Sequence, residues 1–337
     1  MTPKTVAAQP FEGLALPTES GTHFAGSGTC AACHTGMTDG TGEDVSIDST
    51  WRSSMMANAA RDPYWQAAVQ AEVAATPGLT EVIEDKCSTC HMPMARTTDS
   101  FTGTPGTIFD NGYTDPNSAL QSLAMDGVSC TTCHQIADIN LGTVESFSGG
   151  FSIDSDLPLG ERAVYGPFPV TRQAFMMMGN MTGFIPVESP HIQESAVCAT
   201  CHTLTTPYVD AAGAVAGTFP EQMPFLELVA SDLPFSCQDC HMPEASGEVV
   251  VSVMGPQVGR SEFSRHLFVG GNDFMMSIMS NFGEEMGLTA SGEHVAGTQE
   301  RIADQLTGST ATVAVGEAAS EGDLWTVPVE IATATGH

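Results

Sequence analysis

The chain has few basic residues. It carries 10 Lys and Arg against 40 Asp and Glu, which gives a formal net charge of -30. Proteins that bind nucleic acid or anionic lipid need a basic surface, so this balance excludes both classes of partner. A strongly acidic surface is typical of a chain kept well solvated, and it also suits a cationic partner or a saline habitat.

Aromatic residues and long apolar runs are scarce as well. Phe, Trp and Tyr make up 7% of the chain, whereas Gly and Pro number 34 and 20. No stretch reaches the roughly 20 apolar residues that a transmembrane helix needs. Residues 1–17 contain no charged region followed by an apolar one, so we expect any export signal to lie outside this sequence. These apolar side chains alone look too few to pack the core of a 337-residue protein, which predicts that a group other than side chains fills part of the core.

Cysteine, in contrast, is placed with strict regularity. The pattern CxxCH occurs as CAACH, CSTCH, CTTCH, CATCH and CQDCH, and it uses all ten cysteines: Cys30, Cys33, Cys87, Cys90, Cys130, Cys133, Cys198, Cys201, Cys237 and Cys240. One such pattern is expected by chance about 0.01 times in a chain of this composition, and it is the signature of c-type haem attachment. We call these motifs 1 to 5 in chain order.

The spacing has a physical reason. Positions i, i+3 and i+4 share one face of a helical turn, so two sulfurs can meet the vinyl groups of one porphyrin edge while the histidine lies beneath the iron. Zinc knuckles and disulfide or redox CxxC pairs leave the five histidines unexplained, and five knuckles do not pair. The sequence therefore predicts five covalently bound haem c groups. Their proximal ligands are His34, His91, His134, His202 and His241.

The remaining histidines match the haems in number. They are His23, His191, His266, His294 and His337, which predicts bis-histidine ligation at all five irons. Methionine is the rival sixth ligand and would raise the potential. The clustered Met55, Met56, Met176, Met177, Met178, Met275, Met276 and Met279 look more like flexible apolar filler.

Two of the spare histidines begin a weak repeat. His23 and His191 each lie seven residues ahead of a motif, at Cys30 and Cys198. This separation is too short for a histidine to reach the far face of its own haem easily. We expect each to ligate a neighbouring haem and so hold two haems close together.

The predicted fold is a haem-packed, mostly irregular coil with short α-helices. Helices are expected at residues 51–75, 272–287 and 293–308, and loops at 99–118 and 141–170. After Gly308 the alternating β-branched residues predict a hairpin, which either packs on the haem module or begins a truncated β domain. The predicted division is a pentahaem module at 1–308 and a hairpin segment at 309–337, ending at a candidate axial histidine.

The chain resembles bacterial multihaem c-type cytochromes. The resemblance is carried by the five motifs, by HIQESAVCATCHTL with the following FPEQMPFLELVASD and CQDCHMP, and by RHLFVGGNDFMM around His266. It implies haem-to-haem electron transfer in the periplasm or outside the cell, with redox proteins or extracellular acceptors as partners. Some members polymerise into conductive filaments, which here would make His23 or His337 a ligand to a haem of the adjacent subunit.

The favoured function is therefore a non-enzymatic electron conduit. The alternatives are an oxidoreductase of hydroxylamine or nitrite type, and a module that captures a small gas ligand. Both need one iron with an open position, and the sequence shows neither an altered motif such as CxxCK nor a surplus of haems over histidines.

Mass spectrometry of the mature protein checks the central prediction. We expect five haem adducts on each chain, because every cysteine belongs to a complete motif. An unmodified polypeptide, or a fully matured one with fewer than five adducts, would contradict it.

Overall fold

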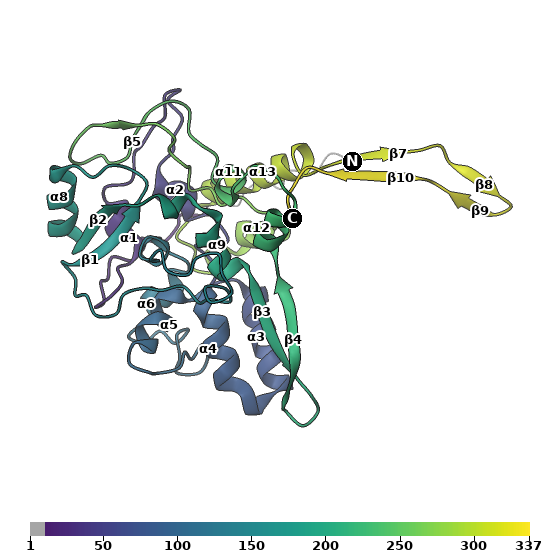
Figure 1. Ribbon diagram of the computed structural model, residues 1–337, viewed down its shortest axis with the longest axis horizontal. Coiled ribbons are helices and arrows are strands. Elements are labelled where there is room, and N and C mark those ends of the chain that lie inside the picture. Colours follow the sequence, from purple (N-terminus) through teal and green to yellow (C-terminus); the bar gives the residue numbers. More distant parts are fainter. Residues whose placement is uncertain (1–10) are drawn as a thin grey trace.

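The computed structural model describes residues 11–337. Figure 1 shows a body of short helices joined by coil, from which one long strand pair projects. Residues 1–10 lie outside the described residues. They belong to the predicted module 1–308 and to the stretch 1–17, in which the sequence predicts no export signal.

Most helices have only one to three turns. The α-helices are α1 (Ser27–Ala31), α2 (Ile47–Trp51), α3 (Pro63–Ala75), α4 (Thr80–His91), α5 (Pro93–Ser100), α6 (Gln121–Met125), α7 (Cys130–Cys133), α8 (Arg172–Thr182), α9 (Ser195–His202), α10 (Pro224–Ala230), α11 (Cys237–His241), α12 (Asp273–Phe282) and α13 (Gly292–Gly308), with 3-10 turns at Pro77–Leu79 and Pro190–Gln193. No helix within residues 11–337 is long and apolar enough to cross a membrane.

The strands form separate two-stranded sheets. The pairs are β1 (Arg162–Gly166) with β2 (Phe184–Glu188), β3 (Leu204–Val209) with β4 (Val215–Gln222), β5 (Val249–Val250) with β6 (Gly259–Arg260), β7 (Ala311–Val315) with β10 (Val329–Thr333), and β8 (Ala319–Glu321) with β9 (Leu324–Thr326). Only β1 and β2 run parallel. Such pairs are marginally stable alone, so the body depends on what they pack against.

The first predicted helix begins later than expected. Residues 51–75 do not form one helix, because α2 ends at Trp51 and α3 starts at Pro63 after a run of turns. The Asp62 carboxylate accepts hydrogen bonds from the amides of Tyr64 and Trp65, and Pro63 occupies the first position. This is a strong helix start, and it overrides the helix propensity of the alanines before it. The two later helices form as α12 and α13.

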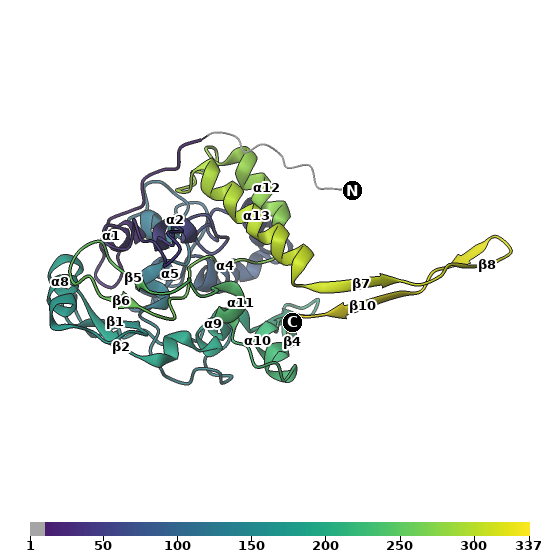
Figure 2. The same cartoon turned by 90° about the horizontal axis from the view of Figure 1, so that it is seen from above.

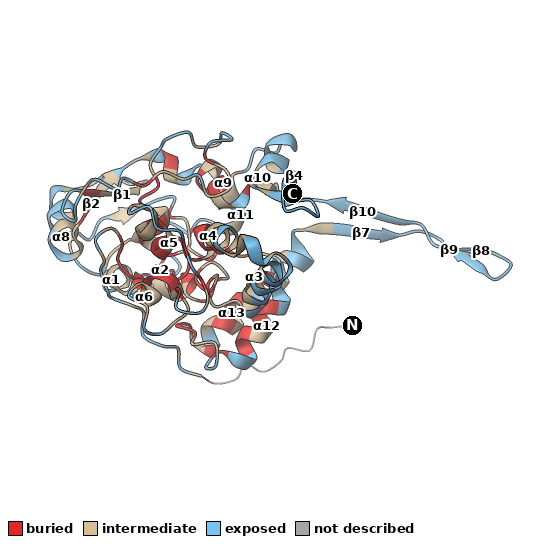
Figure 3. Ribbon diagram, turned by 90° about the horizontal axis from the view of Figure 1, so that it is seen from below, coloured by how far each residue is buried: buried red, intermediate tan, exposed pale blue. Residues whose placement is uncertain are grey.

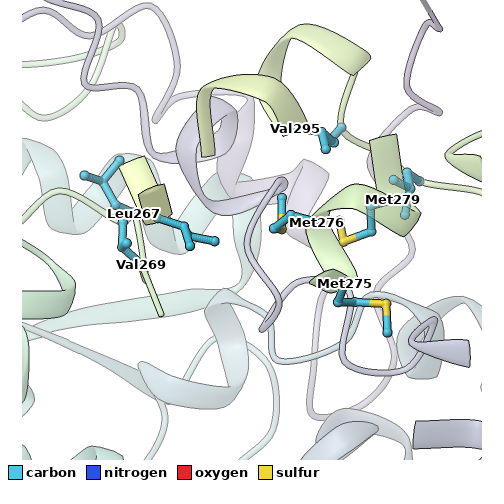
Figure 4. Close-up of a cluster of buried hydrophobic side chains, with 9 residues drawn as sticks. Leu267, Val269, Met275, Met276, Met279 and Val295 are labelled. Carbon is cyan, nitrogen blue, oxygen red and sulfur yellow. The ribbon is translucent and has the colours of Figure 1, made fainter. Parts of the chain in front are cut away.

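The buried apolar residues form several small clusters and not one continuous core. One cluster lies where α12 and α13 pack together, and Figure 4 shows Met275, Met276 and Met279 there with Leu267 and Val295. Three further clusters lie under α3 to α6, between motifs 3 and 4, and beside β5. Figure 3 shows the buried residues confined to the interior of the body. The buried apolar side chains thus form four separate clusters.

The hairpin predicted after Gly308 forms, and it projects from the body as an arm. The arm comprises β7 to β10, residues 311–333, and Figures 1 and 2 show it extending away from every other element. Its apolar side chains are exposed to solvent. The exposed fraction is 63–68% for Val313, Val315, Leu324, Trp325 and Ile331. The arm therefore neither packs along the body nor continues into a larger sheet within the described residues.

A buried arginine connects the coil segment before it to the end of motif 3 by hydrogen bonds. Arg162 is 2% exposed. Its guanidinium donates to Gln135 Oε1 at 2.9 Å and to the carbonyls of Leu157 and Asp154 at 2.6 and 2.5 Å. Desolvation lowers the pKa of Arg162, and the nearby Asp154 opposes that shift. Hydrogen bonds from a charged donor are the stronger kind, so this residue fixes the segment 154–162 against the motif.

Replacing this arginine should destabilise the protein. We expect Arg162→Met to lower the free energy of unfolding of the holoprotein by about 2–4 kcal/mol, because the buried Gln135 Oε1 and two partly buried carbonyls lose their donor. Denaturant titration measures the change. Arg172→Met on exposed α8 is the matched control and should have little effect. Equal losses in the two variants would contradict the role given to Arg162.

Candidate haem centres

Each CxxCH motif lies on a helical turn. Motif 1 occupies α1 and the turn after it, motif 3 occupies α7 and the residue that follows, motif 5 is α11, and motifs 2 and 4 end α4 and α9. In motif 3, for example, the His134 amide donates to the Cys130 carbonyl at 3.1 Å. All ten cysteines are free thiols. The sulfurs and the histidine of each motif are therefore available on one turn, as haem attachment requires.

Four of the motif histidines are held by the same kind of hydrogen bond. Nδ1 of His34 lies 2.6 Å from the Val251 carbonyl, Nδ1 of His134 lies 2.6 Å from that of Tyr165, Nδ1 of His91 lies 3.2 Å from that of Ala59, and Nδ1 of His241 is bonded to that of Val269. A neutral ring that donates through Nδ1 presents its Nε2 lone pair to a metal. Metal-ligating histidines typically have this outer hydrogen bond, so the four rings fit a haem iron.

Desolvation favours the neutral form at these positions. Burial is the largest cause that lowers the pKa of His34, His91, His134 and His202. In motif 4, a hydrogen bond with Gln222 partly opposes the shift at His202. Trp65 stacks on the His91 ring, with 4.3 Å between centroids and 4° between planes. Neutral imidazole is the form that binds iron, so the environment and the ligand chemistry agree.

His266 faces the histidine of motif 3. The centroids of the His134 and His266 rings lie 6.3 Å apart and their planes differ by 17°. His266 Nδ1 lies 3.1 Å from the Ser264 carbonyl, and Phe263 and Phe268 flank the ring at 6.1 and 5.8 Å. Desolvation, followed by the nearby His134 ring, lowers the pKa of His266 to about 3.

His337 faces the histidine of motif 5 in the same way. The His241 and His337 centroids lie 6.0 Å apart, with 18° between the planes. The chain reaches this position from β10, at the base of the arm (Figure 2). The His337 side chain is exposed, unlike that of His266.

The separation in both pairs suits one iron between two rings. Two imidazoles that each bind a metal through a bond of about 2 Å have centroids about 6 Å apart. Pairs 132 and 96 positions apart in the chain have no local reason to adopt this spacing. The residues present at motifs 3 and 5 therefore fit a haem held from both sides.

The other three spare histidines are placed differently. The described residues show no comparable ring pair between a motif histidine and His23, His191 or His294. His23 Nδ1 is buried without a partner. His191 is buried with both nitrogens engaged, at 2.7 Å to Ser189 Oγ and 2.8 Å to the Ile136 carbonyl. His294 lines a cavity of about 430 Å³, which also borders residues 35–38 just after motif 1.

Motifs 1 and 3 pack against each other. The Thr131 hydroxyl in motif 3 donates to the Ala25 carbonyl at 2.9 Å. The Asp126 carboxylate accepts from the Ser27 amide and hydroxyl at 2.8 and 2.7 Å. Desolvation raises the pKa of Asp126 to about 6. A hydrogen bond with Cys30 raises the pKa of Cys130, so the attachment sulfurs of the two motifs are neighbours.

Motif 4 touches both motif 2 and motif 5. The Gly149 amide donates to the Thr200 carbonyl of motif 4 at 2.6 Å, and the Ser148 amide donates to the carbonyl of Thr203, the residue after the motif, at 2.8 Å. A Cβ on Gly149 would lie 2.3 Å from the Thr89 methyl group of motif 2, so glycine is required where the two motifs meet. On the other side, the Cys237 amide donates to Ser195 Oγ at 2.9 Å.

The cysteine sulfurs of these motifs are neighbours at the same contacts between motifs. A hydrogen bond with Cys201 raises the pKa of Cys90, and one with Cys237 raises the pKa of Cys198. Motifs 2 and 4 and motifs 4 and 5 therefore bring their attachment edges together. Cys133 also lies near Cys201, which links motif 3 to motif 4.

Sequence reasoning did not identify the carbonyl partners of the motif histidines. Val251, Val269, Tyr165 and Ala59 act through the backbone, which every residue possesses, so their side chains carry no signal. The ring pairings were also beyond reach, because they join distant positions. The ten cysteines and five motif histidines needed no structure, since their pattern is local.

One family model matches the chain. It describes cytochrome c554 and c-prime, and it matches residues 29–135, which contain the first three motifs. No curated protein and no solved structure matches. The match covers about a third of the chain, yet it includes the haem-attachment pattern that repeats through the remainder. The protein is a c-type cytochrome with covalently bound haem.

Proposed function

We propose that the protein carries single electrons through five bis-histidine haems. The observation that carries the proposal is the pairing of His134 with His266 and of His241 with His337 at 6.3 and 6.0 Å. Iron closed on both faces exchanges electrons without binding substrate. Each bound haem supplies a one-electron redox centre, and the polypeptide supplies the spacing, ligation and exclusion of water.

The ten cysteines anchor the five groups and the motif histidines ligate them proximally. His266 and His337 are the distal ligands at motifs 3 and 5. We assign His23, His191 and His294 to the other three irons. His191 must then release the Ile136 carbonyl, whereas His23 Nδ1 has no hydrogen bond to break.

The packing of the motifs supports a continuous route. Motif 1 adjoins motif 3, motif 3 adjoins motif 4, and motif 4 adjoins both motif 2 and motif 5. Cysteine sulfurs mark the haem edges, so neighbouring sulfurs place neighbouring edges close together. Electrons entering at any motif can then reach the others without crossing a wide gap.

The partners are redox proteins or extracellular electron acceptors. Cytochromes of this type are typically exported, so we expect the protein in the periplasm or outside the cell. The charge of -30 favours a cationic docking face on the partner.

A conductive filament is a second candidate, and the arm favours it. Its unpaired strand edges and bare apolar side chains are features that promote association between chains. His337 already faces His241 of its own chain, so the arm is a better joint than this histidine. Fibres in electron micrographs would support this form, and dispersed particles would count against it.

Spin state distinguishes the conduit from an enzyme. In the oxidised holoprotein we expect only low-spin ferric signals by electron paramagnetic resonance, because two imidazoles close each iron. A high-spin signal equivalent to one iron per chain would instead favour an oxidoreductase of hydroxylamine or nitrite type.

Removing a distal ligand should open one iron. We expect reduced His266→Ala to bind one more carbon monoxide per chain than the parent, measured by its absorbance change, because the ring facing His134 is lost. Met276→Leu is the control for the rival ligand. Met276 lies inside an apolar cluster, so its replacement should leave binding unchanged. A gain in Met276→Leu, or none in His266→Ala, would contradict the assignment.

A further inference from the structure

Arg61 is a half-buried arginine without an acidic partner in the part of the chain that the structure describes. Its guanidinium makes one hydrogen bond within residues 11–337, from Nη1 to the Ala57 carbonyl at 3.5 Å, which is long for such a bond. Three other arginines each form a salt bridge with a carboxylate there, and Arg61 forms none. Residues 1–10 contain no Asp or Glu. In a chain with 40 acidic and 10 basic residues, an arginine without a carboxylate partner is unexpected.

Asp126 acts on Arg61 through its charge, but its oxygens are engaged elsewhere. This carboxylate is 1% exposed and accepts hydrogen bonds from the Ser27 amide and hydroxyl at 2.8 and 2.7 Å. Desolvation raises the pKa of Asp126 to about 6, and the charge of Arg61 opposes that shift only in part. Desolvation also lowers the pKa of Arg61. The two groups therefore interact at a distance, and the guanidinium, which stays charged in proteins, keeps donors available.

These donors lie at a cavity of about 290 Å³, which Arg61 lines. The cavity lies between helix α6, the segment 14–17 and the loop 286–289. None of its lining residues belongs to a CxxCH motif, so it is separate from the candidate haem centres. Besides Arg61, its lining includes the polar Gln121 and Ser122 and the apolar Leu14, Met125 and Met286.

The polar lining of the cavity suits a carboxylate. Arg61 carries a planar fork of N–H groups, whose shape matches the two oxygens of a carboxylate. The Gln121 amide offers a further N–H donor. The Ser122 hydroxyl donates to the Glu19 carboxylate, so a second negative charge would meet repulsion there. The lining therefore provides one cation beside an apolar wall, which fits a single carboxylate on a short hydrocarbon chain.

We propose that this cavity binds one carboxylate and that Arg61 pairs with it. The carboxylate belongs either to a small free monocarboxylic acid or to a propionate of a bound haem, and the recognition chemistry is the same for both. Binding forms an ion pair and hydrogen bonds and breaks no covalent bond. The site does not depend on the five bis-histidine irons of the proposed function.

The site adjoins the turn that orients the histidine of motif 2. The Ala57 carbonyl accepts from Arg61, and the Ala59 carbonyl lies 3.2 Å from Nδ1 of His91. A carboxylate on Arg61 neutralises a positive charge close to this turn. Loss of that positive charge favours the ferric state of a nearby haem, so the bound carboxylate lowers its reduction potential.

Butyrate is the probe for a free acid, and butyramide is its neutral counterpart. Each is titrated by calorimetry into the oxidised holoprotein, as the parent, as Arg61→Gln and as Arg172→Gln, which removes an exposed arginine on α8 and is the charge-matched control. We expect one butyrate per chain in the parent and in Arg172→Gln. Binding should be weaker by about tenfold or more in Arg61→Gln, and for butyramide in the parent, because charge-assisted hydrogen bonds are lost.

A second measurement identifies a haem propionate as the source. In that case the parent binds no butyrate, because the cavity already holds a carboxylate. Arg61→Gln should then shift the propionate bending bands in the resonance Raman spectrum and lower the midpoint potential of one haem, and Arg172→Gln should change neither.

Three results would overturn the proposal: equal butyrate binding by the parent and Arg61→Gln, equal binding of butyramide and butyrate by the parent, or a parent that binds no butyrate together with an unchanged Raman spectrum in Arg61→Gln. If Arg61→Gln does not mature, Arg61→Lys, which keeps the charge but not the fork, replaces it. The haem count by mass is measured on every sample. A count below five in the parent contradicts the proposed function and not the carboxylate site, so the two failures remain distinct.

Discussion

The structure depends on a hydrogen bond from the ring of a motif histidine to a backbone carbonyl elsewhere in the chain. A CxxCH turn is too short to be stable alone, and nothing within it fixes the histidine ring. The carbonyl does so from outside: that of Val251 lies 217 positions from His34, that of Tyr165 comes from strand β1, and that of Val269 comes from coil. Coil segments that look like connections in the sequence therefore orient the ligands.

This constraint gives the irregular backbone a structural role. The coil from 245 to 270 provides the carbonyls for two motif histidines and carries His266 itself. The interior of a helix uses its carbonyls internally, whereas coil and the unpaired edge of a two-stranded sheet such as β1 leave carbonyls available to a side chain. A chain in which four motif histidines bond to such carbonyls benefits from leaving backbone groups outside regular structure. The four small apolar clusters then fill the space between motifs rather than forming a core around which the chain is built.

The sequence predicted local features better than distant ones. CxxCH spacing is decided within five residues, and the helices at 273–282 and 292–308 follow from local capping and composition. The helix at 51–75 was wrong because a strong cap at Asp62 outweighed alanine propensity. The pairing of His134 with His266 depends on how the whole chain packs, so counting histidines predicts a number of ligands but no pairs.

Counting also treated all five spare histidines as equal, and the structure separates them by attachment. His266 is confined by aromatic rings, His191 is engaged at both nitrogens, and His337 is carried by an exposed segment. The same imidazole side chain would therefore need different amounts of rearrangement to bind an iron, depending on what restrains its ring. His266 already faces His134 at the spacing that one metal between two rings requires, whereas His191 would first have to release the Ile136 carbonyl. The number of histidines in a sequence cannot show this difference, because it depends on contacts between distant segments.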